Sequence, residues 1–196
     1  MNSNTADAPL IVGIGGTTRP NSTSERTLAK ALEAAAAKGC RTRLFGGPLL
    51  SQIPIYDPAT ADSSPELQSL LDGVREADGV IIASPGYHGS VSGVVKNALD
   101  ALEGLRADTR PYFDGRAVGC IITADGWQAG GTALSALRTI IHALRGWPTP
   151  LGVSFNPSAN PLFDENGAFR EERDARMIEM LADQVVDFAR MKAASR

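Results

Sequence analysis

Hydroxyl side chains and one arginine are concentrated in a short segment near the N-terminus, residues 15–24. The segment starts with two glycines and runs into an Ala- and Leu-rich stretch of helical character. A helix N-terminus presents unpaired N–H groups and the positive end of the helix dipole, which suits a dianion. Five hydroxyl side chains and the Arg19 guanidinium add further donors. The segment predicts a pocket for one terminal phosphate. The alternative is a capped helix start, with Ser22 or Ser24 as N-cap and Arg19 solvated.

Two other phosphate-binding patterns do not fit this segment. The Walker pattern needs Gly-Lys-Ser/Thr at the helix start, and no lysine occurs before Lys30. The dinucleotide fingerprint needs a third glycine after Gly13 and Gly15, where Thr18 stands. It also needs an acidic residue at the end of the next strand, where residues 46–47 are both glycine. A tightly held dinucleotide in this loop is therefore disfavoured.

A second loop rich in glycine and serine, residues 84–93, follows another apolar run. Pro85 is expected to end the preceding strand, and Gly86 and Gly89 would let the backbone approach a flat ligand closely. Exposed backbone groups here are suited to pair with the polar edge of such a ligand, while Tyr87 covers a face or edge.

Short apolar runs alternate with helical stretches along the chain. The predicted strands are residues 10–15, 42–45, 79–84, 116–123 and 151–155. The predicted helices are residues 24–38, 65–76 (with Ser64 as N-cap), 92–103, a stretch that follows a glycine-rich loop at 126–131 and ends near Gly146, and 171–194. Residues 49–64 are expected to form a long surface loop.

Strands that are apolar along their whole length belong to a parallel sheet covered on both faces. The sequence thus predicts an α/β fold, a doubly wound five-stranded parallel sheet in the order 2-1-3-4-5. In such a sheet, ligands bind outside the carboxyl ends of the strands, between strands one and three. Both loops described above come to that place. We expect residues 1–8 to form a flexible N-terminus and residues 9–196 to form a single domain.

Composition narrows the class of protein. The chain has 196 residues, 43% hydrophobic and 21% charged, with a net charge of −3. These values predict a globular chain with no attraction to nucleic acid, and the strand-sized apolar runs predict no membrane span. The two cysteines, Cys40 and Cys120, form no CxxC pair, and no secretion signal is visible at the start, so we expect reduced thiols in a cytoplasmic protein. Two histidines argue against a His-rich metal site.

Three ordered motifs resemble the NAD(P)H-dependent FMN reductase family, which has a flavodoxin-like fold. The family pattern G-S/T-x-R-x-x-S after the first strand is matched by Gly16, Thr17, Arg19 and Ser22. The pattern T/S-P-x-Y followed by S-x-S/P-G-x-x-K-N-x-L-D is matched by residues 84–87 and 90–100. A Gly-Gly-x-x-A-x-x-x-L-R pattern is similar to residues 130–138. The resemblance spans residues 9–155 and implies FMN and NAD(P)H as cofactors.

The resemblance also implies which residues hold the cofactor. The hydroxyl-rich loop would hold the FMN phosphate, and the second and third loops would contact the ring system. The expected cofactor-binding residues are Thr17, Arg19, Ser22, Thr23, Ser24, Pro85, Gly86, Tyr87, His88, Gly89, Ser90 and Gly126. No catalytic side chain and no metal are expected, because hydride passes directly between the two cofactors.

Some residues depart from the family pattern or stay open. Many members have Glu at the position of Gly86 and Asn at that of His88, so neither ring contacts nor substrate preference can be carried over. His88 is open to a functional role or to that of an ordinary loop histidine. Trp127 would lie over the ring, in the core or at an oligomer contact. Asp57, which precedes Pro58, is read as a turn-forming residue.

The activity implied by the resemblance is hydride transfer from NAD(P)H to flavin, with reduced FMN supplied to a partner monooxygenase or to oxygen. The alternatives are a quinone, azo-dye or chromate reductase with prosthetic FMN, and a flavodoxin-type electron carrier. Family members form dimers or tetramers through the helix after the second loop. Residues 94–102 are apolar around most of that helix, which predicts a homodimer or homotetramer. A preference for NADH or NADPH is not legible in the sequence.

Overall fold

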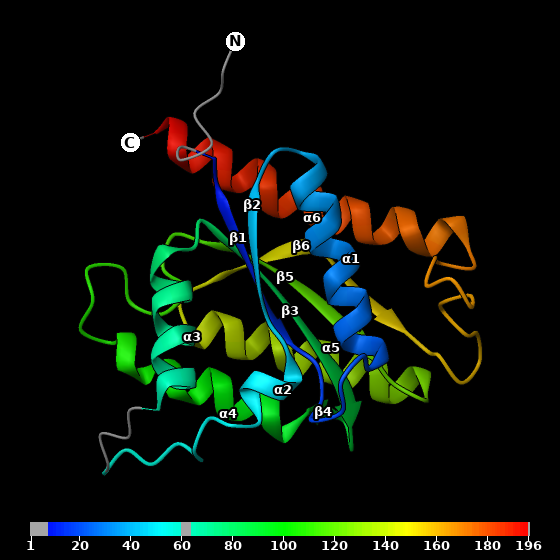
Figure 1. The fold of residues 1–196 in the computed structure, drawn as a ribbon, viewed down its shortest axis with the longest axis horizontal. Helices are drawn as coiled ribbons and strands as arrows, with labels where there is room; N and C mark the ends of the chain where they lie inside the picture. Colours follow the sequence, from blue (N-terminus) through cyan, green and yellow to red (C-terminus); the bar gives the residue numbers. More distant parts are fainter. Residues whose placement is uncertain (1–7, 60–63, 196) are drawn as a thin grey trace.

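Five long strands of the described chain run parallel, in the spatial order β2-β1-β3-β5-β6. The computed structural model describes residues 8–59 and 64–195, and Figure 1 shows its ribbon. The strands are β1 (Leu10–Gly15), β2 (Arg41–Phe45), β3 (Gly79–Tyr87), β5 (Ala117–Thr123) and β6 (Trp147–Phe155). Counted along the chain, this is the predicted order 2-1-3-4-5, and the predicted fold class is confirmed. The predicted flexible N-terminus lies outside the described residues, apart from residue 8.

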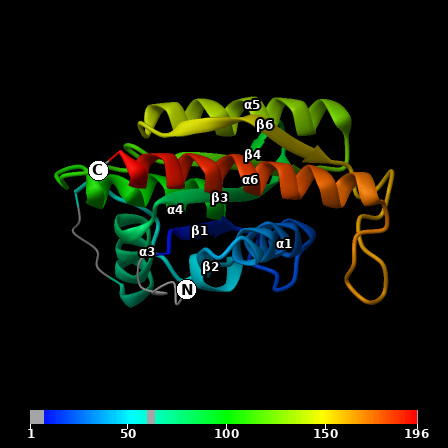
Figure 2. The ribbon, with the colours of Figure 1, turned by 90° about the horizontal axis from the view of Figure 1, so that it is seen from above.

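Helices cover both faces of the sheet, which is why the central strands are apolar along their whole length. On one face, α1 (Thr23–Ala37) packs beside α6 (Glu172–Ala194). The other face is covered by α3 (Pro65–Glu76), α4 (Gly93–Ala101) and α5 (Trp127–Ala143). Seen from above, β2 lies beside α1 at one side of the molecule, and β6 lies beside α5 at the other side (Figure 2).

Helix starts follow the local sequence closely. Ser22 is the N-cap of α1, and its Oγ accepts a hydrogen bond of 3.3 Å from the Glu25 N–H. Ser64 caps α3 in the same way, with the Leu67 N–H as donor at 3.1 Å and Pro65 in the first turn. Both helices begin where a side-chain acceptor satisfies an N–H group that the helix leaves unpaired.

The strand that precedes the second loop is longer than predicted. A short strand, β4 (Ser90–Val91), pairs antiparallel with the end of β3, so that Pro85 does not end β3. The last pair between β1 and β3 is Gly15 with Ala83. Because β1 has ended by Pro85, the missing N–H of this proline removes no ladder hydrogen bond to β1.

Two predicted loops are in part helical. The glycine-rich segment 126–131 is not a loop, because α5 begins at Trp127. Gly130 lets this first turn pack directly on β6, since a Cβ here would lie 2.3 Å from the Ser154 Oγ. The predicted surface loop 49–64 begins inside α2 (Gly47–Leu50), and its Leu50 and Ile53 side chains are buried. Residues 60–63 of that loop lie outside the described chain.

The carboxyl ends of β1, β3 and β5 meet at one edge of the sheet. Register pairs Gly15 with Ala83, and Pro85 with Thr123. Gly15 has φ +150°, and a Cβ there would lie 1.9 Å from the Ala83 carbonyl oxygen. Only glycine permits this approach, and it is what brings the loop after β1 against the loop after β3.

The apolar surface of α4 is already buried within one chain, which corrects the reason given for an oligomer. Val95, Ala98, Leu99 and Leu102 are each no more than 1% exposed in the monomer. They pack against β1, α2, and the short 3-10 helix Leu102–Leu105 that continues α4. Apolar residues around this helix therefore need no second copy to bury them.

Neither cysteine forms a disulfide, and both are buried. Burial raises the pKa of the Cys120 thiol to about 12, so this thiol stays protonated and unreactive at neutral pH. In the described part of the chain, no helix has the length and apolar character needed to cross a membrane.

A charge on the buried face of α4 is expected to unfold the protein. Leu99→Glu places an unpaired carboxylate in the core and should lower the free energy of unfolding by at least about 3 kcal/mol, measured by urea denaturation. Lys96→Glu, on the exposed side of the same helix, is the control and should cost about 1 kcal/mol or less. A folded Leu99→Glu protein of unchanged stability but smaller hydrodynamic size would contradict this placement.

Candidate functional site

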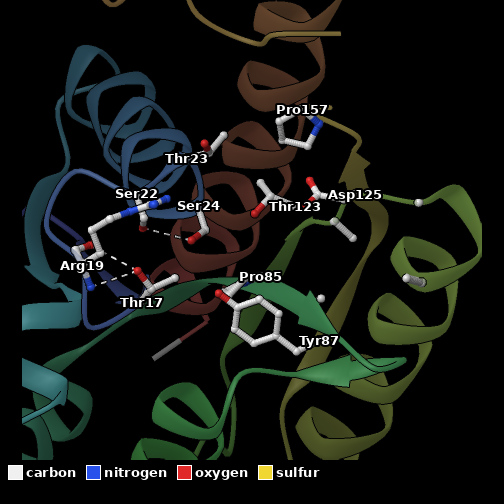
Figure 3. A pocket seen from close by; sticks show the side chains of 14 residues that line it. Thr17, Arg19, Ser22, Thr23, Ser24, Pro85, Tyr87, Thr123, Asp125 and Pro157 are labelled. Carbon is white, nitrogen blue, oxygen red and sulfur yellow. Dashed lines mark hydrogen bonds between the residues drawn. The ribbon is translucent and has the colours of Figure 1, made fainter. Parts of the chain in front are cut away.

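A cavity of about 460 Å³ opens at the sheet edge where β1, β3 and β5 end (Figure 3). This volume is in the range that holds a small-molecule ligand or cofactor. The structure brings most of the predicted residues together here. Those that line the cavity are Thr17, Arg19, Ser22, Thr23, Ser24, Pro85, Gly86, Tyr87 and Gly126.

The rest of the cavity wall comes from residues that sequence reasoning did not name. They lie at or just after the ends of β5 and β6, apart from Ala129 in the first turn of α5, and are Thr123, Ala124, Asp125, Ala129 and Pro157. Their positions at the carboxyl ends of two predicted strands carried the signal, because ligands of doubly wound sheets bind at that edge. The glycine-rich segment 126–131 was named as the ligand-side loop, whereas the strand end just before it was not.

The start of α1 forms the hydroxyl-rich end of the cavity. Ser22 and Ser24 are buried, with their Oγ atoms 3.2 Å apart. The Thr17 Oγ1 accepts a hydrogen bond of 3.1 Å from the Arg19 N–H, which closes a tight turn ahead of the helix. Ser22 caps α1 and also lines the cavity, and its contact with a phosphate stays a prediction. The hydroxyl groups therefore surround the positive end of the helix dipole.

The Glu25 carboxylate fixes this loop against its neighbour. Its Oε2 accepts a hydrogen bond of 2.8 Å from the Gly47 N–H, and its Oε1 accepts one of 3.3 Å from the Asn21 N–H. Asn21 has φ +55°, a left-handed conformation that asparagine tolerates better than most residues. A Cβ at Gly47 would lie 1.5 Å from the Thr17 carbonyl oxygen, so the β2–α2 junction must carry glycine for the loops to touch.

A tight hairpin forms the opposite rim. Gly86 pairs with Val91 and Tyr87 with Ser90, and the two turn residues, His88 and Gly89, have φ +51° and +81°. Positive φ at both turn positions matches a type I′ hairpin. His88, Gly89 and Ser90 lie at this tip and outside the cavity wall, whereas Tyr87 lines it. Their contact with a bound ring stays a prediction.

Gly86 is closely packed against its neighbours. A Cβ at this position would lie 3.0 Å from the Ala124 Cβ and 3.3 Å from the Ala133 Cβ. A larger residue would require the end of β5 and α5 to move by a few tenths of an ångström. The departure from the family pattern at Gly86 is therefore matched by close packing behind the hairpin.

Two charged side chains line the cavity from different loops. Arg19 is exposed and makes no ion pair with a described residue, so its guanidinium is available to an anion. Asp125 comes from the far side of the cavity (Figure 3). Its Oδ1 accepts a hydrogen bond of 2.7 Å from the Ser158 Oγ. One end of the cavity thus favours an anion, and the other end carries a carboxylate.

The remaining open residues are also placed. Trp127 is 66% exposed, so it does not belong to the core of the chain, and it does not line this cavity. Asp57 forms the expected turn, because its Oδ1 accepts a hydrogen bond of 2.8 Å from the Ala59 N–H. Among the described residues, no group of three or more His, Cys, Asp or Glu side chains is arranged to hold a metal.

Removing the Glu25 carboxylate should loosen the hydroxyl-rich loop. Glu25→Ala is expected to lower the free energy of unfolding by about 1.5–3 kcal/mol, because two N–H groups lose a charged acceptor. Glu33→Ala, on the exposed side of the same helix, removes only a surface pair with Lys30 and should cost about 1 kcal/mol or less. Urea unfolding measures both, and equal stabilities of the two variants would contradict the bracing role.

Two kinds of known protein resemble this chain. A solved structure of the NAD(P)H:(acceptor) oxidoreductase FerB from Paracoccus denitrificans superposes with a TM-score of 0.76 and 20% identity, covering 94% of this chain and 98% of that one. A flavodoxin from Streptococcus pneumonia TIGR4 superposes with a TM-score of 0.61 and 12% identity, covering 92% of this chain and 99% of that one. At these identities the likeness establishes the flavodoxin-like fold.

Sequence comparison identifies the family as well as the fold. An FMN-dependent NADPH-azoreductase of Staphylococcus saprophyticus is 31% identical over 125 residues, which are 63% of this chain and 63% of that protein. The match thus spans less than two thirds of that relative's length. Residues 9–160 match the family described as NADPH-dependent FMN reductase, and they include every residue that lines the cavity. The chain belongs to the NADPH-dependent FMN reductase family.

Proposed function

We propose that this protein is an NAD(P)H-dependent flavin oxidoreductase that binds FMN in the cavity at the carboxyl ends of β1, β3 and β5. The observation that carries the proposal is the hydroxyl-rich start of α1, where the buried Ser22 Oγ accepts a hydrogen bond from the Glu25 N–H and lies 3.2 Å from the Oγ of buried Ser24. Such a start fits a monoester phosphate dianion and gives no comparable advantage to an uncharged group.

The residues present fit FMN at both ends of the cavity. Thr17, Arg19 and the serines at the start of α1 would hold the phosphate, while Pro85, Tyr87 and Gly126 would face the ring system. FMN, when bound, supplies the hydride-accepting chemistry. The chain itself would orient the ring and leave one face accessible, because Gly86, Ala124 and Ala129 add little bulk at that end.

Within this class we propose that reduced FMN is supplied to a partner monooxygenase or to oxygen. Tyr87 is the one aromatic residue among those that line the cavity. With one ring available for stacking, affinity would depend mainly on the phosphate, whose contacts water can replace. The same feature argues against a flavodoxin-type carrier, in which the flavin must stay bound.

A second candidate is an azo-dye or quinone reductase with prosthetic FMN. The curated relatives from Staphylococcus saprophyticus and Staphylococcus aureus are named FMN-dependent NADPH-azoreductases, which favours it.

We also propose that residues 9–196 form a single domain, and that the protein is a homodimer or homotetramer in the cytoplasm. The unpaired cysteines are in keeping with that compartment.

Phosphate recognition predicts a clear order of ligand affinities. FMN should bind at least about tenfold more tightly than riboflavin, which has the same ring without the phosphate. Arg19→Ala should weaken FMN binding by roughly 10- to 150-fold and leave riboflavin binding nearly unchanged, because only FMN offers an anion to the guanidinium. Fluorescence-quenching titration measures both ligands.

The matched control is Arg106→Ala. The Arg106 side chain is 76% exposed and pairs with Glu103 at 3.3 Å, on an element that does not line the cavity. This variant should bind FMN like the unmodified protein. Equal affinities of the unmodified protein for FMN and riboflavin would refute the phosphate site.

The two enzyme candidates differ in how firmly FMN is held. If FMN is released during turnover, dialysed protein should lose most of its yellow colour, and the rate of NAD(P)H oxidation should rise with added FMN until it saturates. The absorbance spectrum before and after dialysis and the rate of NAD(P)H oxidation provide the measurement. Protein that stays fully flavinylated and reduces a quinone or azo dye, but not free FMN, would establish the prosthetic-FMN reductase instead.

A further inference from the structure

A second, smaller cavity lies beside the first, and two segments of the chain, residues 126–127 and 156–157, border both cavities. Gly126 lines the first cavity while its neighbour Trp127 lines the second, and Pro157 and Asn156 divide between them in the same way. The second cavity has a volume of about 120 Å³. That is below the size of a site for a whole ligand and suits one fragment of a ligand that also enters the first cavity.

Trp127 is held at the rim of this cavity by the way α5 begins. It is the first residue of α5, and Gly130, three residues later, lies on the same side of the helix. Gly130 lets the first turn pack on Ser154, and Trp127 lines the cavity together with Ser154 and Phe155 at the end of β6. The side chain is 66% exposed, so one flat aromatic surface is available to a ligand.

The walls below the indole combine apolar and amide groups. Phe155 and Leu162 are buried and form an apolar floor. Asn156 and Asn160 add two carboxamides, and the Asn156 Oδ1 accepts a hydrogen bond of 3.1 Å from the Ala159 N–H, which fixes its orientation. An aromatic surface stacks on a base, and a carboxamide can pair with the N6 and N7 edge of adenine.

Two charged residues in the first turn of α6 complete the cavity. Arg173 lines it and makes no ion pair with a described residue. Asp174 lines it too, and partial burial raises the pKa of its carboxyl, against the opposing effect of Arg173. A carboxylate accepts hydrogen bonds from ribose hydroxyls, and a guanidinium binds phosphate oxygens.

We propose that this second cavity binds the adenosine-phosphate half of NAD(P)H, with Trp127 stacked on the adenine and the nicotinamide half reaching the first cavity across Gly126 and Pro157. The inference rests on the proposed function, since it supplies the site for the hydride donor. It makes Trp127 and Arg173 residues that select a dinucleotide over a simple dihydronicotinamide.

Kinetics with a truncated donor test the assignment. Trp127→Ala should lower kcat/KM for NADPH and NADH by roughly 5- to 150-fold, the range expected for one lost base stack. Reduced nicotinamide mononucleotide, which lacks the adenosine half, should give the same kcat/KM in both proteins at saturating FMN. Trp147→Ala is the matched control, since Trp147 is 61% exposed at the other end of β6, where it packs on Phe188.

Direct binding gives a readout that needs neither flavin nor turnover. In a Trp147→Phe background, Trp127 is the only tryptophan, and 5′-AMP or 2′,5′-ADP should change its fluorescence in a saturable titration. Arg173→Ala should weaken this binding about two- to fivefold, as for an exposed charge pair. Arg176→Ala, one turn further along α6 and paired with Glu172, should not. Tighter binding of 2′,5′-ADP would assign a preference for NADPH, and tighter binding of 5′-AMP would assign a preference for NADH.

Failure of this inference and failure of the proposed function give different results. Nucleotide binding at Trp127 without NAD(P)H oxidation would refute the function and leave the cavity assignment standing. NAD(P)H oxidation with no fluorescence response to either nucleotide would refute the inference. So would an equal loss of activity with the dinucleotide and the truncated donor, or a Trp127→Ala protein that light scattering shows to have a smaller assembly.

Discussion

The Glu25 carboxylate joins the loop before α1 to the start of α2, and the hydroxyl-rich end of the cavity depends on this link. It joins the Asn21 N–H, just before α1, to the Gly47 N–H, at the start of α2. This link requires close backbone approach, which Gly47 allows, because a Cβ there would lie 1.5 Å from the Thr17 carbonyl oxygen. With the loop fixed, the Ser22 and Ser24 hydroxyls have one arrangement around the start of α1. Preorganised donors bind an anion more strongly than donors that must first be ordered.

Features set by neighbouring residues could be predicted from the sequence, and those set by distant contacts could not. The Ser64 cap depends on local pattern and was predicted, and Ser22 was one of the two residues expected to cap α1. The predicted order of the strands rested on the alternation of strands and helices along the chain. The hairpin at residues 86–91 depends on the earlier end of β1, and the burial of Leu99 depends on elements that pack around α4. Apolar periodicity shows that a helix face is buried but not whether its own chain or another covers it.

The candidate site divides in the same way. Residues of the first loop are contiguous in sequence and share one chemistry, so the sequence predicted that they lie together, and they line one end of the cavity. Asp125 and Pro157 come from the ends of two further strands, and only the sheet places them opposite Arg19 (Figure 3). The resulting cavity has hydroxyl groups and the Arg19 guanidinium at one end, and the Asp125 carboxylate among small residues at the other, which suits a cofactor anchored by its phosphate and open at its ring.

The proposed FMN site depends most on a phosphate dianion held at the start of α1. A phosphate monoester has a second pKa of about 6 in water, so its ³¹P resonance shifts between pH 5 and 8. Helix N–H groups and the Arg19 guanidinium stabilise the dianion and lower that pKa. The ³¹P signal of FMN bound to the protein should therefore stay constant over this range. A bound signal that titrates near pH 6, as for free FMN, would contradict the phosphate site at α1.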